Sequence, residues 1–271
     1  MHIGKLTQIN VYPIKSTATL SVSRSSVLKR GLEYDRRWMI VDEKGMFLSQ
    51  RKLPRMSLIK TSLAGDSLLV SAPEMSDLLI PYESESEQTM TVKIWGDSVE
   101  AKKLDDAYAE WFEEFLGVNC HVVFMDEQTS RLIDESYTKE DEEVSFADGF
   151  PLLLATQQSL DDVQDRVEDD IDMRRFRPNV VVDGDNKAFA EDGWQRIQIG
   201  QVEFDIVKPC SRCVMTTIDP DTGLKSEDNI PLAQLKTYRA DENGIYFGQN
   251  MIPRNEGVIR VGDDVRLLDG A

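Results

Sequence analysis

Hydrophobic and polar residues alternate in short runs along most of this chain, which is the pattern of half-buried strands. Turn signals separate several of these runs, such as the Gly-Asp pairs at 65–66 and 96–97. Residues 214–223 ("VMTTIDPDTG") are expected to form a further strand that ends in an Asp-Pro-Asp turn. Elsewhere we expect single strands at 6–14, 120–125 and 179–184, and hairpins at 37–50, 58–72, 90–104, 194–210 and 258–268.

Three segments show helical patterns instead. Over 105–116, large apolar residues recur at helical spacing, an aspartate can cap the start, and Gly117 can end the helix. Residues 152–167 are typical of a short strand entering a helix capped by Ser159, and a third helix is expected over 231–238 with proline at its first position. Strands dominate, so the pattern favours barrels or sandwiches over alternating βαβ units.

Composition narrows the classes of function. A chain of 271 residues favours two modest domains over one. Its 49 acidic and 31 basic residues give a formal charge of −18, which argues against nucleic acid and anionic membranes as partners. No apolar run has the length of a membrane span and the N-terminus lacks a signal core, so we expect a cytoplasmic protein with free thiols. The acidic loop 137–149 is expected to be the most mobile region.

Several catalytic motifs are missing from the sequence. It contains no GxGxxG, no GxxxxGK[ST] and no GxSxG, which argues against dinucleotide-binding, P-loop and serine-hydrolase folds. Three cysteines cannot supply the four thiolates of a usual iron–sulfur cluster. Cys120 and His121 are neighbours in an expected strand and point to opposite faces, so they are unsuited to complete a zinc site with the two remaining cysteines.

The stretch "KPCSRC" at 208–213 places two cysteines three positions apart, beside Lys208 and Arg212. Cationic neighbours favour a thiolate, but free cysteine also packs as a small hydrophobe. A thioredoxin-type dithiol is disfavoured because the following segment is expected to be extended. A single thiolate that binds a metal, whose other ligands come from a cofactor, remains open beside simple packing.

Such a cofactor would need an anion pocket, and basic residues stand at the ends of several expected strands. Any one of them taken alone is more often a solvated surface charge. Asn179 can add an amide that hydrogen-bonds a heterocycle, although it can equally begin a strand. The basic clusters are Lys15 with Ser16, Arg36 with Arg37, and Arg174, Arg175 and Arg177.

Five motifs occur in one order along the chain: "VYPIKS", "YDRRWMIVDEKG", "RFRPNVVVDG", "FAEDGW" and "CSRCVMTTIDPDTG". Together they resemble MOSC proteins that carry the MOSC N-terminal domain, among them the mitochondrial amidoxime-reducing component and its bacterial counterparts. The resemblance covers nearly the whole chain. It implies an α+β, strand-rich fold with a smaller β-rich N-terminal MOSC domain with a few short helices at 1–118, followed by a MOSC-type β-barrel domain at 119–271.

The same resemblance implies a cofactor and its contacts. The cofactor is molybdenum–molybdopterin, and the second cysteine of the motif, Cys213, is the expected metal ligand and catalytic residue. Cys210 has no metal role in the family pattern and is expected to pack. The implied cofactor-binding residues are Lys15, Ser16, Arg36, Arg177, Asn179, Ser211, Arg212 and Asn250, the last at a position where the family often has tyrosine.

The implied activity is that of an oxidoreductase that reduces N-hydroxylated compounds, with Asp148 or Asp219 as candidates for proton transfer. Some bacterial relatives append a ferredoxin-type domain, and this sequence ends at Ala271 without one. Electrons are therefore expected from a separate protein of the ferredoxin, flavodoxin or reductase type. The alternative is a sulfur or molybdenum-cofactor carrier that uses a Cys213 persulfide or thiolate without turnover. An inactive scaffold is a third possibility.

Overall fold

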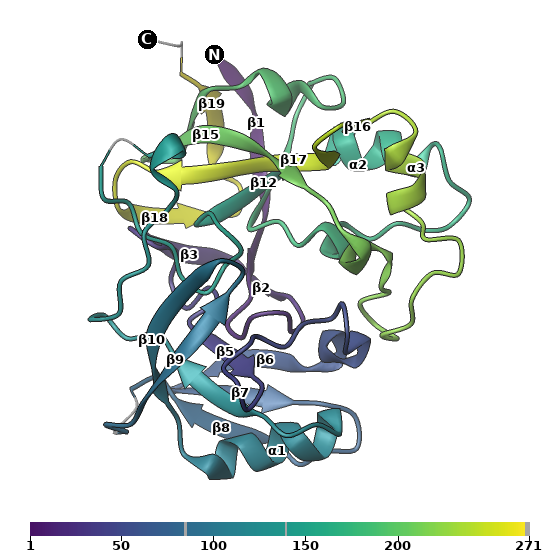
Figure 1. The fold of residues 1–271 in the computed structure, drawn as a ribbon. Coiled ribbons are helices and arrows are strands. Elements are labelled where there is room, and N and C mark those ends of the chain that lie inside the picture. The colour runs from purple at the N-terminus through teal and green to yellow at the C-terminus, as the bar shows by residue number, and fades with distance from the viewer. Residues whose placement is uncertain (84–85, 139, 269–271) are drawn as a thin grey trace.

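The computed structural model describes residues 1–83, 86–138 and 140–268 and is built mainly from strands (Figure 1). Strands make up 40% of it and helices 17%, which confirms the α+β, strand-rich class. No helix among the described residues is long and apolar enough to cross a membrane.

Seven strands close into a barrel in the upper half of Figure 1. The order is β12 (Leu152–Thr156), β13 (Val180–Asp183), β1 (His2–Val11), β19 (Asp264–Leu267), β14 (Arg196–Ile199), β15 (Val202–Ser211) and β17 (Gly244–Pro253), and β17 pairs with β12. Alternate residues such as Leu6, Val180 and Val182 are fully buried in the barrel core. The short strands β2 (Leu20–Val22) and β16 (Ala240–Asp241) extend β1 and β17.

The first strand of the chain is one of the strands that form the wall of this barrel. Strand β1 pairs with β13 on one side and with β19 on the other. Likewise β3 (Arg24–Leu28) pairs with β4 (Gly31–Leu32) and with β18 (Gly257–Arg260). Segments from both ends of the sequence therefore share sheets, and the division at residue 118 stays a prediction.

The prediction of a hairpin at 258–268 is wrong. Strand β18 pairs with β3, whereas β19 pairs with β1 and β14. Ile259 and Val265 still enter the same apolar core, so alternation alone could not separate one hairpin from two strands with different partners.

The lower half of Figure 1 holds two antiparallel sheets. One contains β5 (Trp38–Val41), β11 (His121–Phe124), β10 (Asp97–Lys103) and β9 (Thr89–Ile94), and the other contains β6 (Lys60–Ala64), β7 (Ser67–Ser71) and β8 (Leu78–Pro81). The hairpins predicted around 65–66 and 96–97 are confirmed by the β6–β7 and β9–β10 pairings. The segment 37–50 forms β5 with only an isolated bridge between Val41 and Phe47.

Helix α1 (Asp106–Leu116) confirms the clearest helical pattern. The Asp105 carboxylate accepts the amide of Ala107, and Gly117 ends the helix in a left-handed conformation with φ 72°. Its apolar face, including Phe112 and Phe115, packs into the core of the lower half.

The other helices differ from the predictions at their ends. Helix α2 (Gln157–Gln164) is capped by Thr156, and Ser159 lies inside it. Helix α3 (Leu232–Lys236) follows Pro231 but is shorter than expected. The remaining short helices are of the 3-10 type: η1 (Pro54–Leu58), η2 (Glu135–Tyr137), η3 (Met173–Phe176), η4 (Ala190–Gly193) and η5 (Val214–Thr217).

Helix η5 replaces the strand predicted after Cys213. The Thr216 hydroxyl donates to the Cys213 carbonyl at 3.0 Å, and the Thr217 hydroxyl donates to the Val214 carbonyl at 2.8 Å. Such local bonds compete with strand pairing, which explains why β-branched residues coil here. The Asp-Pro-Asp turn is confirmed, because the Asp219 carboxylate accepts the amides of Asp221 and Thr222.

The acidic loop 137–149 is only partly a surface loop. Its residues 144–147 are buried, and the Phe146 amide donates to the Arg36 carbonyl. The buried Arg131 guanidinium donates to the carbonyls of Ser145 and Ala147. Residue 139 lies outside the described residues, and mobility of the exposed part stays a prediction. The buried part leads to Asp148, whose carboxylate pairs with the Lys15 ammonium.

Candidate functional site

One pocket of about 330 Å³ is lined by residues from both halves of the molecule. Its wall includes Phe47 and Trp95 of the lower half and Cys210 and Met215 that lie at and beyond the end of the barrel strand β15. All nine residues predicted from sequence lie around it: Lys15, Ser16, Arg36, Arg177, Asn179, Ser211, Arg212, Cys213 and Asn250. Residues separated by more than 200 positions thus converge on one cavity.

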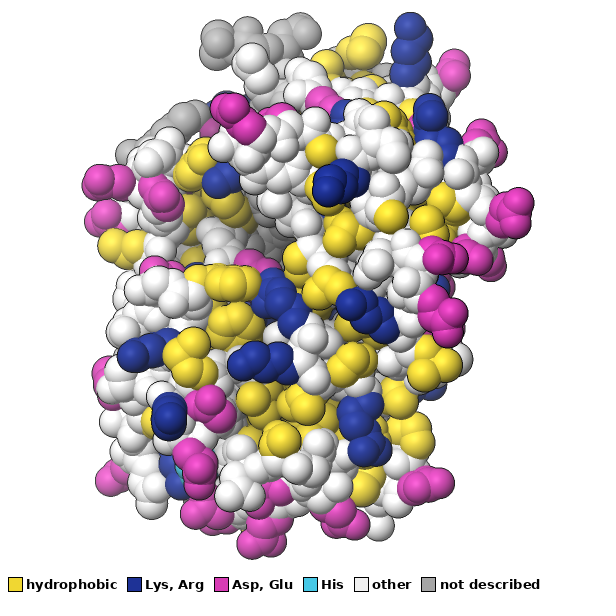
Figure 2. Space-filling view, turned by 45° about the vertical axis from the view of Figure 1, so that its right-hand side comes forward, with side chains coloured by type: hydrophobic (Ala, Val, Ile, Leu, Met, Phe, Trp, Pro, Cys, Tyr) yellow, Lys and Arg dark blue, Asp and Glu magenta, His cyan; other side chains and the backbone are white. Residues whose placement is uncertain are grey.

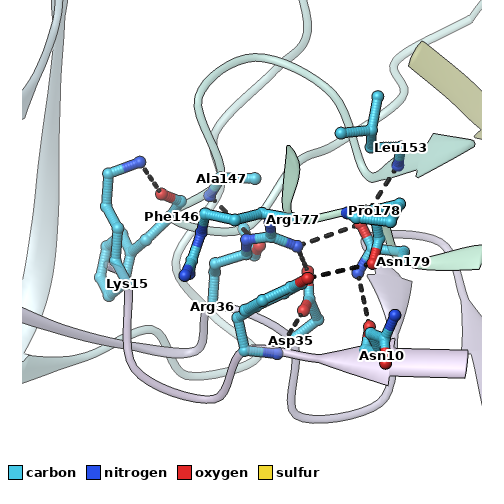
Figure 3. Close-up of polar contacts among 12 residues, drawn as sticks. Asn10, Lys15, Asp35, Arg36, Phe146, Ala147, Leu153, Arg177, Pro178 and Asn179 are labelled. Atoms are coloured by element: carbon cyan, nitrogen blue, oxygen red, sulfur yellow. Dashed lines mark hydrogen bonds and ion pairs between the residues drawn. The ribbon is translucent and has the colours of Figure 1, made fainter. Parts of the chain in front are cut away.

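Lys15 follows β1 and is held in the pocket by the buried loop. Its ammonium donates to the Phe146 carbonyl at 2.7 Å and to Asp148 Oδ1 at 2.5 Å (Figure 3 shows the bond to Phe146). Burial lowers the pKa of Lys15 to about 8, although the Asp148 charge acts in the opposite direction. Burial would raise the pKa of Asp148, but Lys15 and then Arg51 outweigh it and hold that pKa well below its usual range.

Arg36 is oriented by a buried polar network. Its Nη1 donates to the Asp35 carboxylate and to Asn179 Oδ1, the latter at 3.0 Å (Figure 3). Asn179 also accepts the Leu153 amide at 3.1 Å and donates to the Asn10 carbonyl at 3.1 Å. The Asn179 amide therefore fixes Arg36 and joins three strands, besides lining the pocket.

Arg177 supplies a second, partly buried guanidinium to the pocket. It ends helix η3 with a positive φ of 56°, and its Nη1 donates to the Thr17 carbonyl at 2.6 Å. Among the described residues it forms no salt bridge with a carboxylate, and burial lowers its pKa to about 10. The guanidinium carbons of Arg36 and Arg177 lie 4.3 and 4.1 Å from the centre of the buried Tyr12 ring. Two cations thus share one aromatic support.

The cysteine motif lies at the end of β15. The Arg212 guanidinium donates to the Phe176 carbonyl at 2.6 Å and to Cys210 Sγ at 2.9 Å. The sequence placed Lys208 beside the thiols, but its ammonium lies 4.6 Å from the Tyr137 ring centre and outside this pocket. Cys210 is half-buried rather than a fully packed core residue.

Cys213 caps helix η5 and lines the pocket with its half-buried side chain. Its carbonyl accepts both the amide and the hydroxyl of Thr216, which fixes the backbone that carries the thiol. Among the described residues, no group of three or more His, Cys, Asp or Glu side chains is suited to hold a metal ion. Cys213 is thus a candidate for a single protein ligand, not for part of a protein-only metal cage.

The other basic residues of these sequence clusters form contacts outside the pocket. Arg37 donates to the Met125 carbonyl and to Glu127. Arg174 and Arg175 form ion pairs with the acidic turn around Asp219. Asp219 builds this turn and does not line the pocket, whereas Asp148 does.

The sequence did not predict an aromatic wall of the pocket, formed by Phe47 and Trp95, or the adjoining Arg51. The Arg51 guanidinium lies 4.4 Å from the Trp95 ring centre and 3.9 Å from the Asp148 carboxylate. Phe47 meets Trp95 edge-on with ring centres 5.3 Å apart. The one signal in the sequence was a tryptophan in a tight turn, where it adopts a φ of 56° and stays 52% exposed.

Comparison with known proteins gives two family matches. Residues 3–119 match the family described as "MOSC N-terminal beta barrel domain", and residues 141–266 match the "MOSC domain". Mitochondrial amidoxime-reducing component 1 of Mus musculus is 35% identical to this chain, and the match covers 98% of this chain and 83% of the relative. The Homo sapiens protein of the same name is 33% identical with the same coverage, and that of Danio rerio is 32% identical, with 97% and 84% covered.

Proposed function

The chain belongs to the MOSC family, in the group that contains the mitochondrial amidoxime-reducing components, and we propose that it is a molybdenum-dependent reductase of N-hydroxylated compounds. In the proposed reaction an amidoxime accepts two electrons and two protons, and it becomes an amidine and water. The observation that carries the proposal is the convergence of Cys213 with the buried Lys15 ammonium and partly buried arginine side chains in one pocket.

The pocket suits a polyanionic cofactor. Arg177 is partly buried and, among the described residues, without a carboxylate partner, and the Nε of Arg212 is buried without a hydrogen bond. Buried cations are costly unless a negative group compensates them. A phosphate-bearing pterin provides such a group, and Lys15, Arg36, Arg177 and Arg212 would hold it.

Cys213 would bind the molybdenum as a thiolate, because soft sulfur donors suit this class of metal. When bound, the cofactor supplies the two-electron chemistry that cleaves the N–O bond. The chain supplies the rest. The Lys15 ammonium has a pKa of about 8, so its Nζ can release a proton near neutral pH, and Asp148 keeps it positioned. The wall of Phe47 and Trp95 would receive a flat substrate group.

The carrier alternative uses the same thiolate and cations and differs only in turnover.

The proposal also includes a cytoplasmic location and a separate protein as electron donor. Fractionation of the native cells with antibody detection tests the location.

Protein produced in a host that makes molybdopterin, and reduced with methyl viologen, tests the activity. We expect about one molybdenum per chain and conversion of benzamidoxime to benzamidine. Bound molybdenum without conversion of benzamidoxime or hydroxylamines would favour the carrier. If the protein contains no molybdenum and shows no turnover, the proposed function is wrong.

A further inference from the structure

One stretch of this acidic chain has a charge of the opposite sign. Residues 44–65 contain Lys44, Arg51, Lys52, Arg55 and Lys60 and no aspartate or glutamate. Since the whole chain carries −18 and this stretch +5, the other residues carry −23. The stretch spans the loop between β5 and β6, including helix η1.

This stretch reaches the pocket. Arg51 lines the pocket itself, and the next residue, Lys52, is exposed. Arg55 is exposed, and its guanidinium lies 4.2 Å from the centre of the Phe115 ring. Figure 1 places the loop on the side that Figure 2 turns forward, where Lys and Arg side chains lie among hydrophobic ones and acidic side chains lie mainly toward the margins.

An exposed apolar side chain lies beside these cations. A Cβ on Gly223 would lie 3.5 Å from Arg55 Cα and 3.4 Å from a side-chain atom of Leu58, so the 219–223 turn rests against helix η1. The next residue, Leu224, is 70% exposed. An apolar centre with a charged rim is the usual anatomy of a protein–protein contact.

We propose that Lys52, Arg55 and Leu224, together with the adjoining Lys60, form the docking surface for a small acidic electron-transfer protein. The proposal rests on the proposed reductase function, in which a separate protein donates the electrons. The −23 carried by the other residues repels an acidic partner from the rest of the surface, so encounter is steered to this face. Docking here brings the donor to the pocket that contains Arg51 and Cys213.

Charge reversal at two positions of this surface tests it. With photoreduced acidic [2Fe–2S] ferredoxin or flavodoxin as donor, we expect K52E/R55E to raise the KM for the donor about tenfold or more, and added salt to do the same to the wild type. Turnover with methyl viologen should stay within about twofold. The matched control is R24E/R260E, which reverses two exposed charges on the β3–β18 pair. Leu224→Ala serves as a second variant without a charge change, and it should also raise the donor KM.

Calorimetry of the oxidised donors measures binding independently of turnover. Weaker binding by K52E/R55E and Leu224→Ala, with the control unchanged, supports the surface even if no N-hydroxylated substrate is reduced. No binding of either donor to the wild type, or an equal loss in the control, overturns it. Retention of the wild type on anionic vesicles or DNA, lost in K52E/R55E while donor binding is unchanged, also overturns it.

Discussion

The ammonium of Lys15 and the carboxylate of Asp148 meet at 2.5 Å although 133 positions separate them in the chain. This contact joins the segment after β1 to the buried loop and places a titratable group in the pocket. Because burial lowers the pKa of Lys15 to about 8, the group changes protonation near neutral pH.

The pH dependence of turnover follows from this pair. Without a cofactor, Lys15 is protonated below its pKa of about 8 and neutral above it. The negative charge of a bound cofactor raises this pKa, so kcat/KM should fall as the pH rises through about 8 or above. Asp148→Asn removes a charge that raises the pKa of Lys15, and the falling limb should move to lower pH. Profiles from pH 6 to 10 with methyl viologen check this. If the falling limbs of the two pH profiles coincide in the wild type and in Asp148→Asn, Lys15 is not the group that titrates.

Removal of the Asn179 side chain should affect both stability and cofactor binding. Asn179→Ala leaves the Leu153 amide and the Asn10 carbonyl without these side-chain bonds and releases Arg36. We expect a loss of about 2 kcal/mol in the free energy of unfolding, measured with urea, and a lower pterin content. Asn255→Ala is the control, because its side-chain bonds are exposed and it does not line the pocket. An equal effect in both variants would argue against a special role of Asn179.

The two cysteines of the motif should behave differently. Cys213→Ala should abolish molybdenum binding, measured by mass spectrometry of the metal, whereas Cys210→Ala should retain most of it. Cys210 accepts a bond from Arg212 at 2.9 Å, so a moderate effect through Arg212 is compatible with the proposal. Retention of metal and activity by Cys213→Ser would show that the ligand assignment is wrong.

The aromatic wall should act on substrate binding rather than on electron flow. Trp95→Ala removes a ring that is 52% exposed and lines the pocket. The KM for benzamidoxime should rise about three- to tenfold, while kcat and the KM for hydroxylamine itself change little. The matched comparison is Trp111→Phe in helix α1, away from this pocket. An equal rise for both substrates would assign Trp95 a structural role instead.

The sequence predicted the strands and the basic site better than the path of the chain between them. Lys15, Arg36 and Arg177 could be found because each lies within a recognisable motif near the end of an expected strand and because five motifs keep one order. Trp95 could not, since its place opposite Arg51 depends on how the β9–β10 hairpin packs. Helix η5 was missed because two threonine hydroxyls decide its conformation locally, against their usual preference for strands.

The place of β1 in the barrel has a consequence for how the protein is made. Apart from the short β2, its partners are β13 and β19, and β19 ends at Leu267. The ribosome must therefore release residues through Leu267 before the first strand is paired on both sides. Lys15 follows that strand and Asn250 lines the same pocket, so the pocket has its full lining only after residue 250 has been released. A cofactor that contacts both residues must then bind after most of the barrel has been made.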